Sequence, residues 1–124
     1  MRIDAVRTTL HSDETVSAGN SSTAVILALG ANLSGAWGTP HQTLNRAVKE
    51  LAALDIAILS IAPTYSSSPL GAQRQPIFLN TVIVCNAPYS VVQLLRICKS
   101  LERMAGRRRG RRWGARALDI DIIL

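Results

Sequence analysis

The sequence predicts an α+β fold of the ferredoxin-like type, a βαββαβ sandwich in which two helices cover one face of an antiparallel sheet. Two observations support this prediction. Four apolar stretches have the length of strands, and two amphipathic stretches, each opened by a capping-box sequence, follow the first and the third of them. A chain of 124 residues is also long enough for one domain that buries its own core.

The first two elements are expected to be a buried strand and an amphipathic helix. Residues 23–30, TAVILALG, form a continuous apolar run that ends at a glycine, as in a central strand. In the segment 39–54, Thr39 is the expected N-cap, a proline takes the first helical position, and Gln42 completes a capping box. The apolar residues at helical spacing, which should face the core, are Leu44, Ala47, Val48, Leu51 and Leu54.

Two further strands, a helix and a last strand complete the pattern. The strands are expected over 56–66 and 78–86, with a proline- and glycine-containing loop between them. Ser90 and Gln93 form a second capping box, which opens a helix over 91–105. The residues expected to face inward from this helix are Val91, Leu94, Leu95, Cys98, Leu101 and Met104 or Ala105. The fourth strand is RALDIDIIL, 116–124.

The last strand carries two aspartates in an apolar context. Because successive side chains of a strand point to opposite faces, Asp119 and Asp121 share one face, and the apolar residues between and beside them share the other. If the apolar side packs under the helices, both carboxylates face the open side of the sheet. They can hold divalent cations such as magnesium there, or they can simply form a solvated face.

The basic charge of the chain is concentrated just before this strand. The net charge is +6, but the segment 96–116 holds nine basic residues and one acidic residue, so the remainder of the chain is slightly acidic. Arginine side chains match phosphate oxygens in a bidentate geometry, which indicates a polyanionic partner. The segment could bind a nucleotide polyphosphate, bind RNA, or remain a solvated loop. No GxxxxGK[ST] sequence is present, which excludes a P-loop enzyme.

Three blocks of the sequence resemble one known family. They are ALGANL (28–33), SSSPLGAQRQPIFLN (66–80) and LERMAGRRRGRRWGARALDIDIIL (101–124). With them the chain resembles the hydroxymethyldihydropterin pyrophosphokinases, which transfer the diphosphate of ATP to the hydroxymethyl group of 6-hydroxymethyl-7,8-dihydropterin in folate biosynthesis and release AMP. The family pattern continues beyond the last strand, so the resemblance implies a C-terminally truncated member.

The resemblance also implies a role for individual residues. It makes Asp119 and Asp121 the ligands of two Mg²⁺ ions, with ATP as the co-substrate, and it makes Arg107 and Arg116 the catalytic arginines. The positions that match ATP-binding residues are Lys99, Glu102, Arg109, Trp113, Arg116 and Ile122. Those that match pterin-binding residues are Ser67, Ser68, Leu70, Phe78 and Asn80. Phe78 would stack on the pterin ring, and Asn80 would hydrogen-bond its amide-like edge.

The remaining expectations concern the whole chain. Residues 1–22 lack a signal or transit pattern and are expected to be a disordered tail before the pyrophosphokinase-like domain at 23–124. We expect a monomeric, cytoplasmic enzyme that binds ATP and the pterin, with no membrane or nucleic-acid partner. Cys85 and Cys98 are expected to be small buried residues of a reducing compartment. The alternative is a non-catalytic RNA-binding module that uses the arginine-rich loop.

Overall fold

The computed structural model describes residues 23–68, 76–106 and 116–123, and the expected tail at 1–22 lies outside these residues. The order of strands and helices along the described chain follows the prediction, except that the second predicted strand is divided into two. In order they are β1 (Thr23–Ala31), α2 (Pro40–Ala52), β2 (Ala57–Ile61), β3 (Tyr65–Ser67), β4 (Phe78–Ala87), α3 (Val91–Met104) and β5 (Asp119–Ile123).

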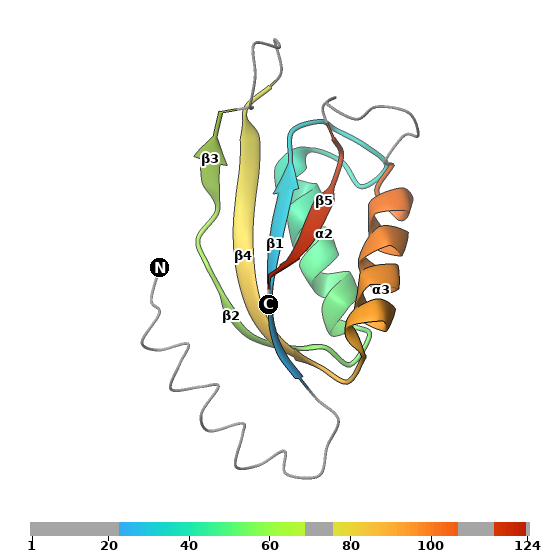
Figure 1. The fold of residues 1–124 in the computed structure, drawn as a ribbon. Coiled ribbons are helices and arrows are strands. Elements are labelled where there is room, and N and C mark those ends of the chain that lie inside the picture. Colours follow the sequence, from blue (N-terminus) through green and yellow to red (C-terminus); the bar gives the residue numbers. More distant parts are fainter. Residues whose placement is uncertain (1–22, 69–75, 107–115, 124) are drawn as a thin grey trace.

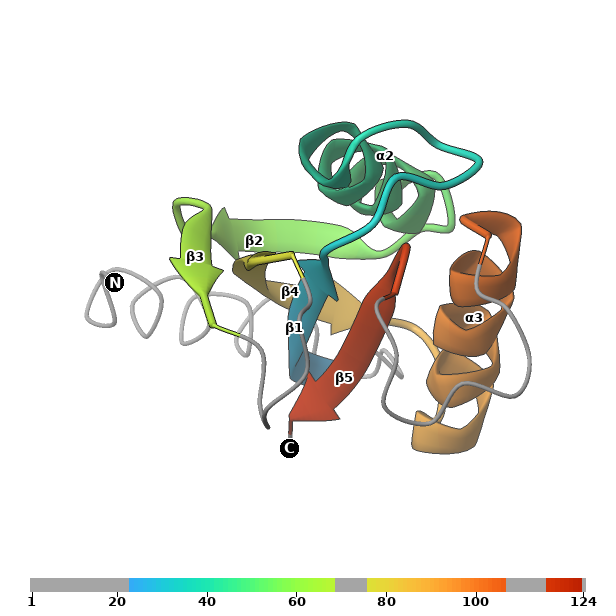
Figure 2. The same ribbon diagram turned by 90° about the horizontal axis from the view of Figure 1, so that it is seen from above.

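The strands form one antiparallel sheet with the order β2-β4-β1-β5, and β3 pairs with one end of β4. Both helices lie against the same face of this sheet (Figures 1 and 2). This arrangement confirms the predicted α+β, ferredoxin-like fold. Within the described ranges, no helix covers the other face of the sheet, and the central strands β1 and β4 run through its middle.

The predicted strand over 56–66 is in fact two strands. The pairing of β2 with β4 shifts its register between Ile58 and Ser60, and regular pairing stops before Pro63. Proline has no N–H to donate to a ladder, which explains the interruption. The chain then pairs again as β3, with Tyr65 opposite Asn80 and Ser67 opposite Phe78. This second pairing brings polar residues to the open face of the sheet.

The two capping boxes are present as predicted, with Thr39 and Ser90 as the N-caps. The predicted inward faces of the helices were partly wrong. Leu54 is exposed because α2 ends at Ala52, two residues earlier. The buried residues of α3 are Leu94, Cys98, Leu101 and Glu102, with Ala105 buried at its C-cap. Val91 and Leu95 were predicted to face inward but lie on the rim of this stripe, each about half exposed. Of the two alternatives at the end of the helix, Ala105 is the buried one and Met104 is about half exposed.

Both cysteines are buried and unpaired, as predicted. Burial raises the pKa of the Cys85 thiol from 9.0 to about 11. The pKa of the Cys98 thiol is raised to about 11 as well, mainly by burial and secondarily by the negative charge of Glu102. The two thiols therefore stay protonated at neutral pH and behave as core residues. Across the described part of the chain, no helix is long and apolar enough to span a membrane.

Candidate functional site

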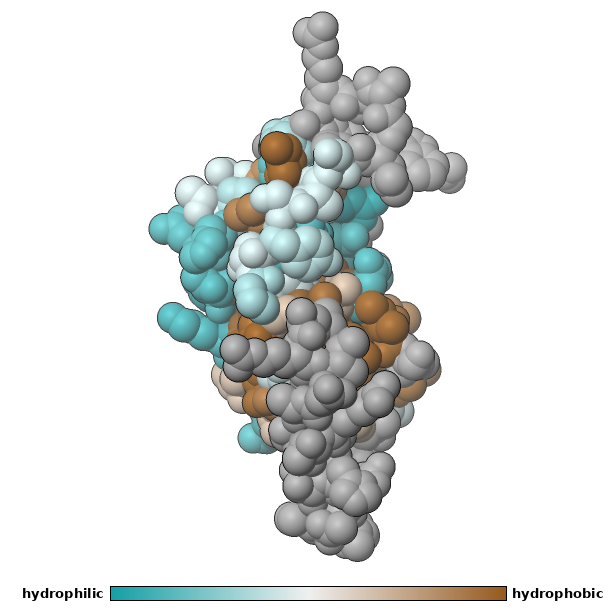
Figure 3. All heavy atoms as spheres, turned by 90° about the vertical axis from the view of Figure 1, so that its left-hand side faces the viewer, coloured by the Kyte–Doolittle hydropathy of each residue, from teal (hydrophilic) through white to brown (hydrophobic). Residues whose placement is uncertain are grey.

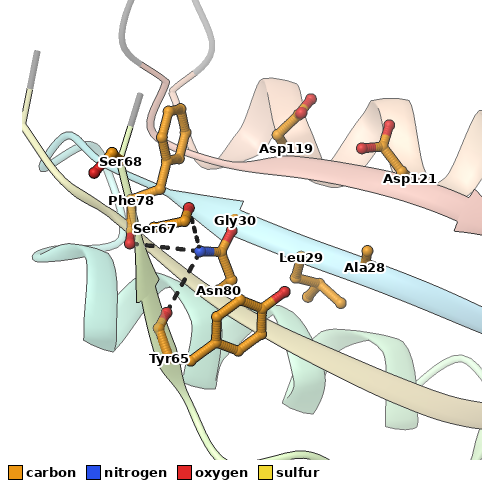
Figure 4. Close-up of a pocket in the computed structure, with 10 residues that line it drawn as sticks. All are labelled: Ala28, Leu29, Gly30, Tyr65, Ser67, Ser68, Phe78, Asn80, Asp119 and Asp121. Atoms are coloured by element: carbon orange, nitrogen blue, oxygen red, sulfur yellow. Dashed lines mark hydrogen bonds between the residues drawn. The ribbon is translucent and has the colours of Figure 1, made fainter. Parts of the chain in front are cut away.

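A pocket of about 230 Å³ lies on the open face of the sheet, at the end where β3, β4, β1 and β5 come together (Figure 4). Its walls combine an aromatic ring, an amide, hydroxyl groups and two carboxylates. The residues that line it are Ala28, Leu29, Gly30, Tyr65, Ser67, Ser68, Phe78, Asn80, Asp119 and Asp121. The pocket therefore brings together residues from four strands that are far apart in the sequence.

The two aspartates point to the open face because of the register between β1 and β5. Asp119 pairs with Gly30 and Asp121 with Ala28, so small residues stand beside both carboxylates. Between them, Ile120 points to the helices and is 2% exposed. The predicted split of β5 into an acidic open face and an apolar buried face is thus confirmed (Figure 4).

Asn80 is held in a fixed orientation at the opposite side of the pocket. Its Nδ2 donates to Ser67 Oγ at 2.8 Å and to the backbone carbonyl of Tyr65 at 3.4 Å. The amide nitrogen is therefore turned toward β3, and Oδ1 lies on the side of Gly30, where a Cβ atom would approach it to 3.1 Å. This leaves Oδ1 as an acceptor beside the ring of Phe78 (Figure 4).

The outer wall of the pocket is only weakly polar. Seen from the side of β2 and β3, the upper part of the surface, where β3 lies, has the pale colours of such residues (Figure 3). Tyr65, Ser67 and Ser68 are all exposed there. Hydroxyl groups and an aromatic ring suit a flat heterocycle better than a charged ligand. The charged residues of the pocket lining are the two aspartates on the β5 side.

Arg116 lies next to the carboxylates. Its Nη1 is 3.5 Å from Asp119 Oδ1, and the two side chains are 21% and 34% exposed. Among the described residues, no group of three or more histidine, cysteine, aspartate or glutamate side chains could hold a metal ion. The two aspartates still fit magnesium, because this ion commonly takes one or two carboxylates and completes its shell with phosphate oxygens and water.

Three residues that match ATP-binding positions lie away from the pocket. Glu102 is completely buried, and its Oε2 accepts the backbone N–H of Ile120 at 2.8 Å. Its Oε1 is 3.4 Å from Nζ of Lys99, which is about half exposed on α3. Ile122 packs against the core on the helix side of β5. The structure gives Glu102 a clear structural role, which is to tie α3 to β5.

Four predicted site residues, Leu70, Arg107, Arg109 and Trp113, lie outside the described residues. Four residues of the pocket were not predicted as site residues, namely Ala28, Leu29, Gly30 and Tyr65. The apolar pattern over 56–66 predicts one long strand that contains Tyr65, although Pro63 nearby signals a break. The sequence pattern indicates Gly30 only as the end of a strand, whereas its missing side chain leaves room for Asn80 Oδ1.

Comparison with known proteins gives a consistent result. Residues 26–124 match the family model for 7,8-dihydro-6-hydroxymethylpterin-pyrophosphokinase. Curated proteins named 2-amino-4-hydroxy-6-hydroxymethyldihydropteridine pyrophosphokinase are similar to the chain. That of Haemophilus influenzae is 38% identical over 99 residues, which cover 79% of this chain and 59% of the relative. That of Mycobacterium leprae is 41% identical over 105 residues, 82% of this chain and 50% of the relative. The chain thus spans about half to three fifths of these relatives.

Proposed function

The chain belongs to the 7,8-dihydro-6-hydroxymethylpterin-pyrophosphokinase family, and on that basis we propose that it serves the diphosphate transfer from ATP to 6-hydroxymethyl-7,8-dihydropterin in folate biosynthesis. The observation that carries the proposal is the pocket. It places a ring-stacking and hydrogen-bonding wall opposite two carboxylates and an arginine, on one open face. A pterin and a triphosphate require these two kinds of surface side by side.

The pterin would bind at the β3–β4 side. The ring of Phe78 offers a flat apolar surface for stacking. Asn80 Oδ1 can accept a hydrogen bond from the ring amide or the amino group of the pterin, because Nδ2 is already engaged by Ser67. The hydroxyl groups of Ser67 and Ser68 lie on the same wall and can complete the polar contacts. Leu70 would add an apolar contact.

The phosphates would lie at the β5 side. Asp119 and Asp121 would hold two magnesium ions, which, when bound, supply neutralisation of the charge on the phosphate oxygens. Arg116 can exchange its carboxylate partner Asp119 for a phosphate oxygen, since guanidinium groups bind both anions with the same geometry. The residues proposed for further contacts to ATP are Lys99, Glu102, Arg107, Arg109, Trp113 and Ile122.

The proposed reaction is a direct transfer between the two substrates, without a covalent enzyme intermediate. The pterin hydroxyl oxygen attacks the β-phosphorus of ATP, the bond from that phosphorus to the α-phosphate oxygen breaks, and AMP leaves with the electron pair. The hydroxyl proton passes to solvent. The contribution of the protein is to align the two substrates and to stabilise the developing charge, which the positions of Phe78, Asn80 and Arg116 support.

An RNA-binding module finds little support in the sheet. RNA-recognition sheets stack bases on aromatic residues of their central strands. Here β1 and β4 carry a single aromatic residue, Phe78, at the first position of β4. The RNA-binding alternative therefore rests on arginine content alone, and we do not adopt it. The monomeric state and the cytoplasmic location remain predictions.

Calorimetric titration tests the proposal. The chain should bind α,β-methylene-ATP in the presence of magnesium, and EDTA should abolish this binding. It should also bind 6-hydroxymethylpterin, the oxidised form of the pterin. The proposal would be contradicted if the chain did not bind the nucleotide analogue but bound a single-stranded RNA. If this RNA binding did not depend on magnesium or on either small molecule, it would favour the RNA-binding alternative.

A further inference from the structure

The loop 32–38, between β1 and α2, binds the two residues that flank the segment 106–115, which are Ala105 and Arg116. At the start of that segment, the backbone N–H of Ala36 donates to the carbonyl of Ala105 at 3.0 Å. At its end, the N–H groups of Asn32 and Leu33 both donate to the carbonyl of Arg116, at 3.0 and 3.2 Å. The loop therefore fixes the C-terminus of α3 and the beginning of the β5 region relative to each other.

The side chain of Asn32 extends this connection to the pterin side. It is 2% exposed, although it belongs to a loop. Its Oδ1 accepts the backbone N–H of Arg116 at 2.7 Å, and its Nδ2 donates to the carbonyl of Pro76 at 3.1 Å. Pro76 lies two residues before Phe78. One buried amide thus joins the end of β1 to two segments that are 44 and 84 residues away in the sequence.

The close approach of the loop to both ends requires a glycine at position 35. A Cβ atom on Gly35 would lie 2.5 Å from the carbonyl oxygen of Ala105 and 2.7 Å from Cβ of Ala117. Both distances are well inside van der Waals contact. The backbone of the loop therefore packs directly between the end of α3 and Ala117, and any side chain at position 35 would overlap with both.

We propose that Asn32 is a positioning residue for the diphosphate transfer. It lies outside the pocket lining and acts through Arg116 on the phosphate side and through Pro76 on the pterin side. Its single amide sets the distance between the wall that would stack the pterin and the arginine that would contact the phosphates. The inference rests on the proposed function, since it concerns the alignment of those two substrates.

Two substitutions separate the two halves of this role. Asn32→Ala removes both hydrogen bonds, so the dissociation constants of α,β-methylene-ATP with magnesium and of 6-hydroxymethylpterin should each rise about tenfold. Asn32→Asp keeps an acceptor for the N–H of Arg116 but turns a carboxylate oxygen toward the carbonyl of Pro76. It should raise the dissociation constant of the pterin about tenfold and change that of the nucleotide less than about threefold.

Tyr89→Phe is the matched control. The Tyr89 hydroxyl donates to the carbonyl of Leu54 at 2.7 Å, so this variant also loses a hydrogen bond from a side chain to a distant backbone carbonyl. Tyr89 follows β4 at the end opposite to Phe78, away from the pocket. The melting temperature of Tyr89→Phe should fall while both dissociation constants stay unchanged. This variant therefore gives the effect of losing a hydrogen bond that has only a structural role.

The measurement is calorimetric titration of the full chain and its variants with each probe, combined with amide hydrogen exchange at Arg116 and Phe78. Two results in Asn32→Ala would support the inference. The amides of Arg116 and Phe78 should exchange faster while that of Ile83 in the core is unchanged, and the dissociation constants of both probes should rise as stated. Dissociation constants in Asn32→Ala and Asn32→Asp that match those of Tyr89→Phe would overturn it. If Asn32→Ala does not fold, the selective loss in Asn32→Asp decides the question.

The same samples separate the inference from the proposed function. If the wild-type chain binds both probes but converts ATP to ADP, the proposed function is wrong, and the pattern of dissociation constants still decides the role of Asn32. If the wild-type chain releases AMP and the Asn32 variants bind like the control, the inference is wrong and the function stands. Binding of neither probe by the wild-type chain would contradict both.

Discussion

Replacing Gly30 by alanine tests how the pterin wall is built. The new Cβ atom would lie 3.1 Å from Asn80 Oδ1, 3.7 Å from Cδ1 of Phe78 and 3.8 Å from the carbonyl oxygen of Leu79. Only the first distance is too short. Asn80 must therefore move by a few tenths of an ångström, but its Nδ2 is held by Ser67 Oγ at 2.8 Å. The substitution thus displaces the acceptor proposed for the pterin and leaves the stacking surface in place.

The expected effect is a loss of binding without a loss of stability. Displacing one hydrogen-bond acceptor costs about 0.5–1.5 kcal/mol, which corresponds to a two- to tenfold rise in the dissociation constant of 6-hydroxymethylpterin. The free energy of unfolding should stay the same or increase by up to about 1 kcal/mol, because alanine restricts the unfolded chain more than glycine does. Gly30 has no positive φ angle that would oppose the change.

A double-mutant cycle with Asn80→Ala provides the control. Titration calorimetry gives the dissociation constants of the four proteins, and urea unfolding gives their stabilities. Gly30→Ala should weaken the pterin in the wild-type background and have no further effect once Asn80 is alanine, since Oδ1 is then absent. An equal weakening in both backgrounds would refute the reasoning, because the contact would then be with Phe78 or with the backbone.

The remaining predictions concern β5, α3 and the buried thiols. Asp121→Ala should abolish magnesium-dependent binding of α,β-methylene-ATP in calorimetry and leave the melting temperature unchanged or slightly raised, because one of two neighbouring negative charges is lost. If Asp121→Ala keeps full magnesium-dependent nucleotide binding, the metal assignment is wrong. Ile120→Asp, on the opposite face, should instead destabilise the fold by roughly 4 kcal/mol or more in urea unfolding. Glu102→Ala should cost about 1–3 kcal/mol, because it leaves the buried N–H of Ile120 without an acceptor, whereas Glu102→Gln keeps an acceptor and should cost less. Burial raises the pKa of both cysteine thiols to about 11, so the stability they contribute is complete below pH 9 and is lost as the pH rises toward 11. The double variant with alanine at Cys85 and Cys98 should lose less stability between pH 9 and 11 than the wild type, and an identical loss would contradict this.

The elements and the two faces of β5 could be predicted because they depend on local patterns. The capping boxes at Thr39 and Ser90 are complete within four residues of sequence, and strand alternation alone places Asp119 on the side opposite to Ile120. The position of Asn80 in a pocket also followed from the resemblance. The capping boxes and the strand alternation need only the sequence near the residue concerned, whereas the inference on Asn80 needs all three matching blocks.

The rest depends on contacts between distant segments. Glu102 looks like a surface residue, yet it is buried, where it accepts the backbone N–H of Ile120, 18 residues away. Val91 kept helical spacing but is about half exposed at the first position of α3. The role of Asn32 does not follow from local periodicity, because its side chain bonds to Pro76 and Arg116, which lie beyond position 70. Periodicity does not contain this information.

Phosphorus NMR of the nucleotide products tests the central claim most directly. The chain is incubated with ATP, magnesium and 6-hydroxymethyl-7,8-dihydropterin, with omission of the pterin as the control. The account predicts AMP and a pterin diphosphate in equal amounts, formed only when the pterin is present. ADP as the product, or AMP formed equally well without the pterin, would contradict it.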